Sequence, residues 1–221
     1  MGVGVEVRNT IAKRAAAEIQ NGMVVNLGIG IPSLVPNFIK KDQLVMFHAE
    51  NGIVGMGPSP VKGEEDENVC NAGGLPVTVI PGASYCDSST AFGMIRRGLI
   101  DITILGGLQV SEKGDLANWI VPGKKIPGMG GAMELAQKAK KVIVLMNHTD
   151  KKGNSKIVKK CTLPLTSAGI VDLIMTELAV FQVNQKGLTL LEYFSNTSIE
   201  EIREKTACSF QLHHHIKKID G

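Results

Sequence analysis

Apolar residues recur along this chain with two spacings, one typical of helices and one typical of buried strands. Residues 7–19 have apolar positions at helical intervals and stop before Gly22, which predicts an amphipathic helix ended by glycine. Short apolar runs that predict strands follow at residues 23–27, 44–47, 77–80, 100–105 and 142–146. Helical patterns lie between several of these runs, at residues 33–39, 88–97 and 132–140. Because strands and helices alternate, the pattern predicts a three-layer α/β/α fold with a mostly parallel sheet.

The C-terminal quarter of the chain predicts a hairpin and a last helix. Apolar residues at 177–183 and 188–193 bracket the turn sequence Asn184-Gln185-Lys186-Gly187, and a helix is expected at residues 198–206. The adjacent histidines 213–215 follow in what we expect to be a polar tail. Three adjacent histidines cannot all face one ion on a regular element, so we expect no metal site there.

Composition and charge are those of one globular domain spanning residues 1–221. Hydrophobic residues make up 43% of the chain and charged residues 20%, which excludes a disordered or fibrous protein. A formal net charge of +3 is too small to favour nucleic acid or a membrane surface as a partner. No apolar run approaches the roughly 20 residues that cross a bilayer, and the first residues lack a signal-peptide pattern, so we expect a cytoplasmic protein. The four widely spaced cysteines are expected to be buried, reduced thiols.

A carboxylate set against a glycine-rich turn is the first candidate for chemistry. Glu50 ends the apolar stretch 44–47 and precedes Asn51-Gly52 and two further glycines, so a bulky substrate could approach the backbone closely. That is how a nucleophilic glutamate would be presented. The pattern alone is also that of a surface acid followed by an ordinary Asn-Gly turn.

Two glycine-rich stretches each precede a predicted helix. The first contains Gly28 and Gly30 and, with Glu50 about 20 residues downstream, is similar to a dinucleotide-binding fingerprint. Ser33 replaces the third glycine and Pro32 stiffens the turn, so a nicotinamide cofactor is not favoured there; backbone N–H groups that receive an acyl or anionic group are an alternative. The second stretch runs from Pro122 to Met133, where unpaired N–H groups near Gly130 and Gly131 have the local character of an oxyanion hole, or of a plain flexible loop.

Taken together, these segments resemble the family I CoA-transferases, and specifically the β-type subunit of 3-oxoacid or acetate/butyrate–acetoacetate CoA-transferase. The resemblance covers nearly the whole chain. One local departure is His48-Ala49, where many relatives have Gln-Ser or a similar pair, which concerns the hydrogen-bonding neighbours of the nucleophile. The motifs that carry the resemblance are residues 25–32, Glu50-Asn51-Gly52, Asn71-Ala72-Gly73-Gly74, residues 81–85, 114–124, 128–133 and 161–166.

The resemblance implies a CoA-transferase-like fold and a ping-pong transfer of coenzyme A between carboxylic acids. Glu50 would be the nucleophile and would carry CoA as a glutamyl thioester, so that coenzyme A is a substrate and no resident cofactor or metal is needed. Gly131 would stabilise the oxyanion with Gly130 beside it, while Gly28 and Gly30 would form the wall of the acyl pocket. Asn51 is also assigned to substrate binding.

The same resemblance implies a separate α-type partner of similar fold and an α2β2 heterotetramer. The acids exchanged stay open, because acetoacetate is compatible with succinate, acetate or butyrate as the other acid. Two hypotheses from other classes also remain: an NAD-dependent oxidoreductase that uses Gly28, Gly30 and Glu50, and a noncatalytic sugar-phosphate-binding domain of related fold.

Overall fold

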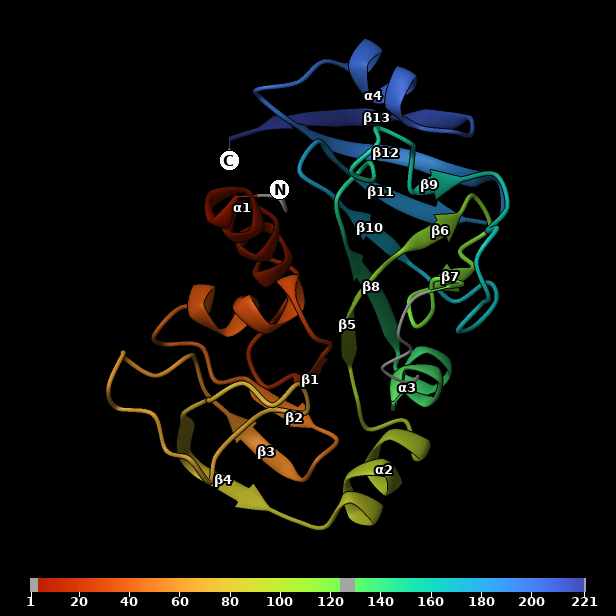
Figure 1. The fold of residues 1–221 in the computed structure, drawn as a ribbon. Coiled ribbons are helices and arrows are strands. Elements are labelled where there is room, and N and C mark those ends of the chain that lie inside the picture. Colours follow the sequence, from red (N-terminus) through yellow and green to blue (C-terminus); the bar gives the residue numbers. More distant parts are fainter. Residues whose placement is uncertain (1–3, 124–129, 221) are drawn as a thin grey trace.

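A ten-stranded sheet runs through the protein, and its strands come from both ends of the chain (Figure 1). The structure is a computed structural model that describes residues 4–123 and 130–220. The strand order is β13-β12-β11-β10-β8-β5-β1-β2-β3-β4. The bounds of these strands are β1 Val24–Leu27, β2 Met46–Ala49, β3 Ile53–Met56, β4 Val79–Tyr85, β5 Ile102–Gly106, β8 Lys141–Leu145, β10 Leu173–Met175, β11 Ala179–Asn184, β12 Gly187–Phe194 and β13 Phe210–Ile219.

The middle of the sheet is parallel and its flanks are mixed. β10, β8, β5, β1 and β2 pair in parallel with one another, as the alternation of strand and helix predicted. Antiparallel pairs join β2 to β3 and β3 to β4 at one flank, and β10 to β11 and β11 to β12 at the other. The carboxyl ends of the five central strands therefore meet at one edge of the sheet, where parallel α/β folds place their ligands.

Helices cover both faces of the sheet, which gives the three layers that the sequence predicted. Helix α1 (Val5–Ala16) and the 3-10 helix η1 (Ile31–Phe38) bury one face, with Ile11 and Val35 in the same core as alternate strand residues such as Ile104. On the other face α2 (Ser88–Arg96) and α3 (Ala132–Lys138) bury Ile95 and Leu135 against each other. Alternate residues of each central strand thus enter different cores, as the two-residue period of a strand requires.

A smaller layer lies on the same face as α3, toward the C-terminal half of the sheet (Figure 1). It is a three-stranded sheet of β7 (Leu116–Ala117), β6 (Gln109–Ser111) and β9 (Ile157–Val158). Helix α4 (Ile199–Lys205) also packs into this core through Ile202, and its N-cap Ser198 accepts a hydrogen bond from the amide of Glu201. The sequence predicted this last helix but none of the three short strands.

Several sequence predictions need correction in the described part of the chain. The segment expected to be a polar tail is β13, which pairs in parallel with β12 and contains His213, His214 and His215. β3 lies where the sequence indicated only a glycine-rich turn. The four cysteines are free, as expected, but each is half-buried rather than buried. No group of residues among those described has the arrangement that would hold a metal ion, and none of the described helices is long and apolar enough to span a bilayer.

Candidate active site

Glu50 stands in the tight turn between the antiparallel strands β2 and β3. Gly52 closes this turn: its amide donates to the carbonyl of Ala49 at 2.9 Å, and its φ of +115° is one that glycine adopts without strain. The turn is also pressed against the start of α2, because a Cβ on Gly52 would lie 2.0 Å from the carbonyl oxygen of Cys86. The Asn-Gly pair recognised in the sequence therefore fixes the direction in which the Glu50 carboxylate leaves the sheet.

A buried amide contacts the Glu50 carboxylate from the neighbouring strand. Asn26 on β1 lies opposite His48 on β2, and both side chains are fully buried. Nδ2 of Asn26 donates to Oε2 of Glu50 at 3.2 Å, and it also faces the carbonyl oxygen and Nδ1 of His48, each at 3.1 Å. Nε2 of His48 in turn lies 3.2 Å from the carbonyl oxygen of Ala91 in α2. One oxygen of Glu50 is thus held by a hydrogen bond while the other is left for chemistry.

Gly131 faces Glu50 from the N-terminus of α3. Gly131 is buried, and a Cβ built on it would lie 3.5 Å from Cγ of Glu50 and 3.2 Å from the ring of Phe92. Any side chain at this position would therefore fill the space beside the carboxylate. The backbone of Gly131 is helical, with φ −79° and ψ −1°, so the absence of a side chain serves the close approach and not the conformation.

A cleft of about 610 Å³ opens beside these groups. The ends of β1 and β5 form one wall, and the start of α3 forms another. Trp119 contributes an aromatic surface, and its indole N–H donates to the carbonyl of Leu165 at 3.2 Å. The lining consists of Gly28, Ile29, Glu50, Ala72, Leu105, Gly106, Gly107, Leu108, Asn118, Trp119, Gly130, Gly131, Ala132 and Leu135.

The structure brings together four of the six residues singled out in the sequence. Glu50, Gly28, Gly130 and Gly131 all line this cleft. Gly28 is also closely packed, because a Cβ on it would lie 3.3 Å from the backbone of Ile104 and Leu105 in β5. The second glycine-rich stretch begins at Pro122, and its residues 124–129 lie outside those described.

Gly30 and Asn51 do not line the cleft. Gly30 is the residue before η1, with φ +91°, and its carbonyl accepts a hydrogen bond from the Ser33 hydroxyl at 2.8 Å. Asn51 is exposed, and its side-chain amide donates to the carbonyl of Cys70 at 2.8 Å, which ties the turn to the loop before β4. The element after Gly30 is a 3-10 helix rather than the α-helix that a dinucleotide fingerprint requires at this point.

No role was predicted for Asn26 or Phe92, and His48 was noted only as a departure from the family pattern that concerns the hydrogen-bonding neighbours of the nucleophile. A signal existed for Asn26, which is a polar residue in the middle of an apolar strand, and such residues are buried only with hydrogen-bond partners. Burial lowers the pKa of His48 below the usual 6.5, although the hydrogen bond to Ala91 and the charge of Glu50 act in the opposite direction.

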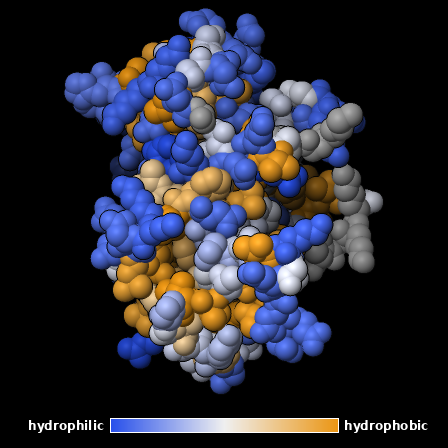
Figure 2. Space-filling view, turned by 90° about the vertical axis from the view of Figure 1, so that its left-hand side faces the viewer, coloured by the Kyte–Doolittle hydropathy of each residue, from blue (hydrophilic) through white to orange (hydrophobic). Residues whose placement is uncertain are grey.

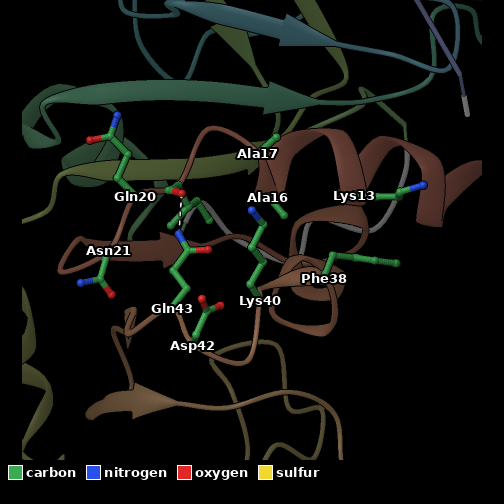
Figure 3. A pocket seen from close by; sticks show the side chains of 10 residues that line it. Lys13, Ala16, Ala17, Gln20, Asn21, Phe38, Lys40, Asp42 and Gln43 are labelled. Carbon is green, nitrogen blue, oxygen red and sulfur yellow. Dashed lines mark hydrogen bonds between the residues drawn. The ribbon is translucent and has the colours of Figure 1, made fainter.

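A second hollow of similar volume lies between α1 and the segment that follows η1 (Figure 3). Figure 3 shows Lys13, Lys40 and Asp42 around it, and Gln43 reaches across to donate to the carbonyl of Ile19 at 2.6 Å. None of the six sequence-predicted site residues lines it. Volume does not distinguish the two hollows, so the nucleophile and its partners identify the cleft at Glu50 as the candidate site.

Comparison with known proteins identifies the family. The family model described as "Coenzyme A transferase" matches residues 8–205. A probable coenzyme A transferase β chain of Bacillus subtilis is 62% identical over 212 residues, which are 96% of this chain and 98% of that protein. The B-type subunit of a succinyl-CoA:3-ketoacid coenzyme A transferase from Helicobacter pylori is 49% identical and is covered over its whole length, with 94% of this chain matched.

Longer relatives match this chain over only part of their own length. The mitochondrial succinyl-CoA:3-ketoacid coenzyme A transferase 2B of Mus musculus is 53% identical over 95% of this chain, which spans only 41% of that protein. The acyl-CoA transferase YdiF of Escherichia coli O157:H7, solved as a thioester complex with CoA, superimposes with a TM-score of 0.76 at 20% identity over 96% of this chain and 43% of its own. The chain belongs to the coenzyme A transferase family, and within family I it is of the β-subunit type. The fold and the enzyme class that the sequence resemblance implied are thereby confirmed.

Proposed function

We propose that this chain is the catalytic subunit of a CoA-transferase that moves coenzyme A between a 3-oxoacid, such as acetoacetate, and another short carboxylic acid, by a ping-pong reaction through Glu50. Succinate, acetate and butyrate are the candidate second acids. The observation that carries the proposal is the cleft in which the Glu50 carboxylate lies against Gly131, with one oxygen held by Asn26. The names of the Helicobacter and mouse relatives favour succinate among these acids.

The first half of the reaction would transfer CoA to the protein. The free oxygen of Glu50 attacks the carbonyl carbon of the thioester. The electron pair of the thioester C=O π bond moves to the carbonyl oxygen. Collapse of this oxyanion breaks the C–S bond, so that CoA leaves as a thiolate and an acyl-glutamyl anhydride remains. The thiolate then attacks the glutamyl carbonyl of the anhydride. The first acid leaves as a carboxylate, and a glutamyl-CoA thioester remains on Glu50.

The second half would run the same steps in reverse with another acid. The incoming carboxylate attacks the glutamyl thioester, the thiolate leaves and re-attacks the acyl carbon of the new anhydride, and Glu50 returns to its carboxylate form. Water takes no part, so the reaction needs a cleft that limits water at the anhydride. The oxyanion would be stabilised by the amide of Gly131, with Gly130 beside it, and one such donor is commonly worth about 10²–10³-fold in rate.

The residues around the nucleophile fit these roles to different degrees. Gly28 forms part of the cleft wall, as a residue of the acyl pocket should. Gly30 and Asn51 lie outside the lining, so we assign them to the support of η1 and of the Glu50 turn. A carboxylate is a weak nucleophile, and positioning together with the binding energy of the remote CoA moiety has to supply much of the rate.

An α-type partner is part of the proposal. The relatives of similar length are named as β or B subunits, and the mouse relative is more than twice as long, which fits a fusion with an α-type half. The cleft is also open on one side, where the apolar side chain of Ile29 is 67% exposed. We propose that the α-type partner covers the cleft and contributes to CoA binding, in an α2β2 assembly.

The surface offers further apolar area for such a partner. Figure 2 shows apolar side chains gathered in the lower half of the face that contains η1 and β2–β4, while the upper half is mostly hydrophilic. Exposed apolar side chains in this part of the chain include Leu44, Val61, Leu75, Val79 and Tyr85. Patches of this kind mark interaction sites more often than isolated apolar residues do.

Residues 1–221 would form one domain of that assembly, and a cytoplasmic location stays a prediction of the sequence.

Steady-state CoA transfer by the complex tests the proposal. We expect E50Q, which keeps the size and the Asn26 contact but removes the nucleophile, to lose at least about 10⁴-fold in kcat with acetoacetyl-CoA and succinate. E64Q is the matched control, because Glu64 is exposed in the loop before β4, and it should keep the native rate. Transfer by E50Q at a rate within tenfold of the native complex would refute the assignment of Glu50.

A further inference from the structure

Three buried polar side chains lie side by side across the middle of the sheet and lead to Glu50. Thr103 on β5, Asn26 on β1 and His48 on β2 occupy paired register positions, and each is fully buried. Buried polar groups are unfavourable unless hydrogen bonds compensate them, and a packed apolar core would be the simpler solution at this place. The contacts of His48 give the reason for this row.

The hydrogen on the His48 ring is fixed by its neighbours. Nε2 lies 3.2 Å from the carbonyl oxygen of Ala91, which can only accept, so Nε2 carries the hydrogen. Because burial lowers the pKa of His48, the ring is neutral near pH 7 and its Nδ1 is a bare acceptor. Nδ1 therefore accepts a hydrogen bond from Nδ2 of Asn26 at 3.1 Å.

The Asn26 amide is oriented by acceptors alone. Its nitrogen carries two hydrogens and shares them among three acceptors, which are Nδ1 and the carbonyl oxygen of His48 and Oε2 of Glu50. Turning the amide over would place its oxygen against the same three acceptors. In the observed orientation Oδ1 of Asn26 is buried and has no hydrogen-bond partner among the described residues. The same holds for Oγ1 of Thr103. Such an arrangement is unfavourable for folding and is kept where the amide hydrogens serve another purpose.

We infer that His48 is a positioning residue for CoA transfer, whose bare Nδ1 holds the Asn26 amide so that an N–H is directed at one oxygen of the Glu50 nucleophile. The inference rests on the proposed function, because it concerns the reactivity of that carboxylate. The hydrogen bond restricts rotation of the carboxylate and leaves its second oxygen to attack. His48 does not line the cleft and acts on the Glu50 carboxylate through Asn26.

The other ring nitrogen extends the same control to the opposite wall of the cleft. Ala91, which accepts from Nε2, is followed in α2 by Phe92, whose ring would be 3.2 Å from a Cβ on Gly131. One imidazole therefore connects the strand that leads to the nucleophile with the helix that supports Gly131. The His48 side chain therefore influences the distance between Glu50 and Gly131.

Protonation of the imidazole would undo this arrangement. A hydrogen on Nδ1 would face the amide hydrogens of Asn26, so the amide would have to turn or the ring would have to move, and Glu50 would lose its donor. Among the described residues, Glu50 is the charged side chain whose charge acts on this ring, and it favours protonation. The charged residues at the ends of α2 face elsewhere: Asp87 caps the helix through the amide of Thr90, Arg96 pairs with Glu134, and Arg97 is exposed.

Two substitutions separate positioning from mere structure. H48N keeps an acceptor near the place of Nδ1 but cannot titrate, whereas H48F fills the volume and offers no acceptor. The measurement is the rate of CoA adduct formation on Glu50 in the complex, with acetoacetyl-CoA and no acceptor acid, from pH 8 to pH 5. Protonation of Glu50 itself slows every variant in acid, so the readout is the ratio of native to variant rate, and the unfolding midpoint is recorded at each pH.

We expect H48N to form the adduct within about fivefold of the native rate at pH 8. The native-to-H48N ratio should fall in acid, as the imidazole of His48 takes up its proton below the usual pKa. H48F should form the adduct at least tenfold more slowly than the native protein at pH 8. Between acid and neutral pH its rate should rise by no more than the rate of H48N does. A ratio that does not change as His48 takes up its proton, or an H48F rate equal to the native rate, overturns the role of His48 and leaves the Glu50 mechanism intact. An active native complex that forms no adduct on Glu50 overturns the proposed function as well.

Discussion

Replacing Gly52 by alanine should break the turn that presents Glu50. The new Cβ would lie 2.0 Å from the carbonyl oxygen of Cys86, so backbone atoms would have to separate by about 1 Å to reach the 3.0 Å that real contacts keep. The φ of +115° adds roughly 1–3 kcal/mol of strain for a residue with a side chain. Separation would also weaken the hydrogen bond from the amide of Cys86 to the carbonyl of Gly52, worth about 1 kcal/mol. The expected loss in the free energy of unfolding is about 3–5 kcal/mol.

Gly63 provides the matched control for this substitution. Its φ is +92°, but nothing lies within 4 Å of the position of its Cβ, so G63A carries the backbone strain without the overlap. We expect G63A to lose about 1–2 kcal/mol. Urea unfolding followed by circular dichroism compares the two variants, with the slope checked for equality. If G52A and G63A differed by less than about 0.5 kcal/mol, the close contact between the Glu50 turn and the start of α2 would be wrong.

Two further predictions concern the cleft and the second core. G131A should lose less than about 1 kcal/mol of stability, because its backbone is helical. Its kcat should fall about 10–100-fold, since the methyl group would crowd the ring of Phe92 and occupy the space beside Glu50. G130A strains the backbone at a φ of +55° but its Cβ has nothing within 4 Å, so it should lose less in kcat, and equal rates would contradict the geometry. The pKa of His148 is lowered to about 4 by burial, so the unfolded chain binds a proton that the native state does not; the free energy of unfolding should therefore fall by about 3 kcal/mol as pH drops from 6.5 to 4. H148Q should lack that part of the fall. The same dependence of the free energy of unfolding on pH in both proteins would contradict the lowered pKa of His148.

The fold could be predicted where short-range patterns decide the structure. The central strands are apolar runs and the helices have apolar positions at helical spacing with clear ends, such as Gly98 after α2, whose φ is +69°. β3 escaped prediction because Gly52, Gly55 and Gly57 give its segment the pattern of a loop. β13 escaped because it is an edge strand with polar residues on both sides, held by its parallel pairing to β12. That pairing is a tertiary contact, and no local period reports it.

The candidate site, too, could be predicted only where local sequence patterns reveal it. Glu50 and Gly131 were singled out from motifs and from the family resemblance, but only the folded chain places Cγ of one 3.5 Å from the Cβ position of the other. The contact between His48 and the carbonyl of Ala91 joins a strand to a helix through a backbone atom, which carries no residue-specific signal. Asn26 was the exception, because an amide in an apolar strand could have been recognised as a buried residue in need of partners.

The central claim is that Glu50 carries coenzyme A during transfer, and mass mapping of its peptide tests this most directly. The complex with its α-type partner is incubated with acetoacetyl-CoA without an acceptor acid, quenched and digested, with E50Q and E64Q treated in parallel. We expect a CoA adduct on the Glu50 peptide of the native and E64Q proteins that disappears on addition of succinate, and no adduct with E50Q. An active native complex with no adduct on that peptide, or with the adduct on another residue, would contradict it.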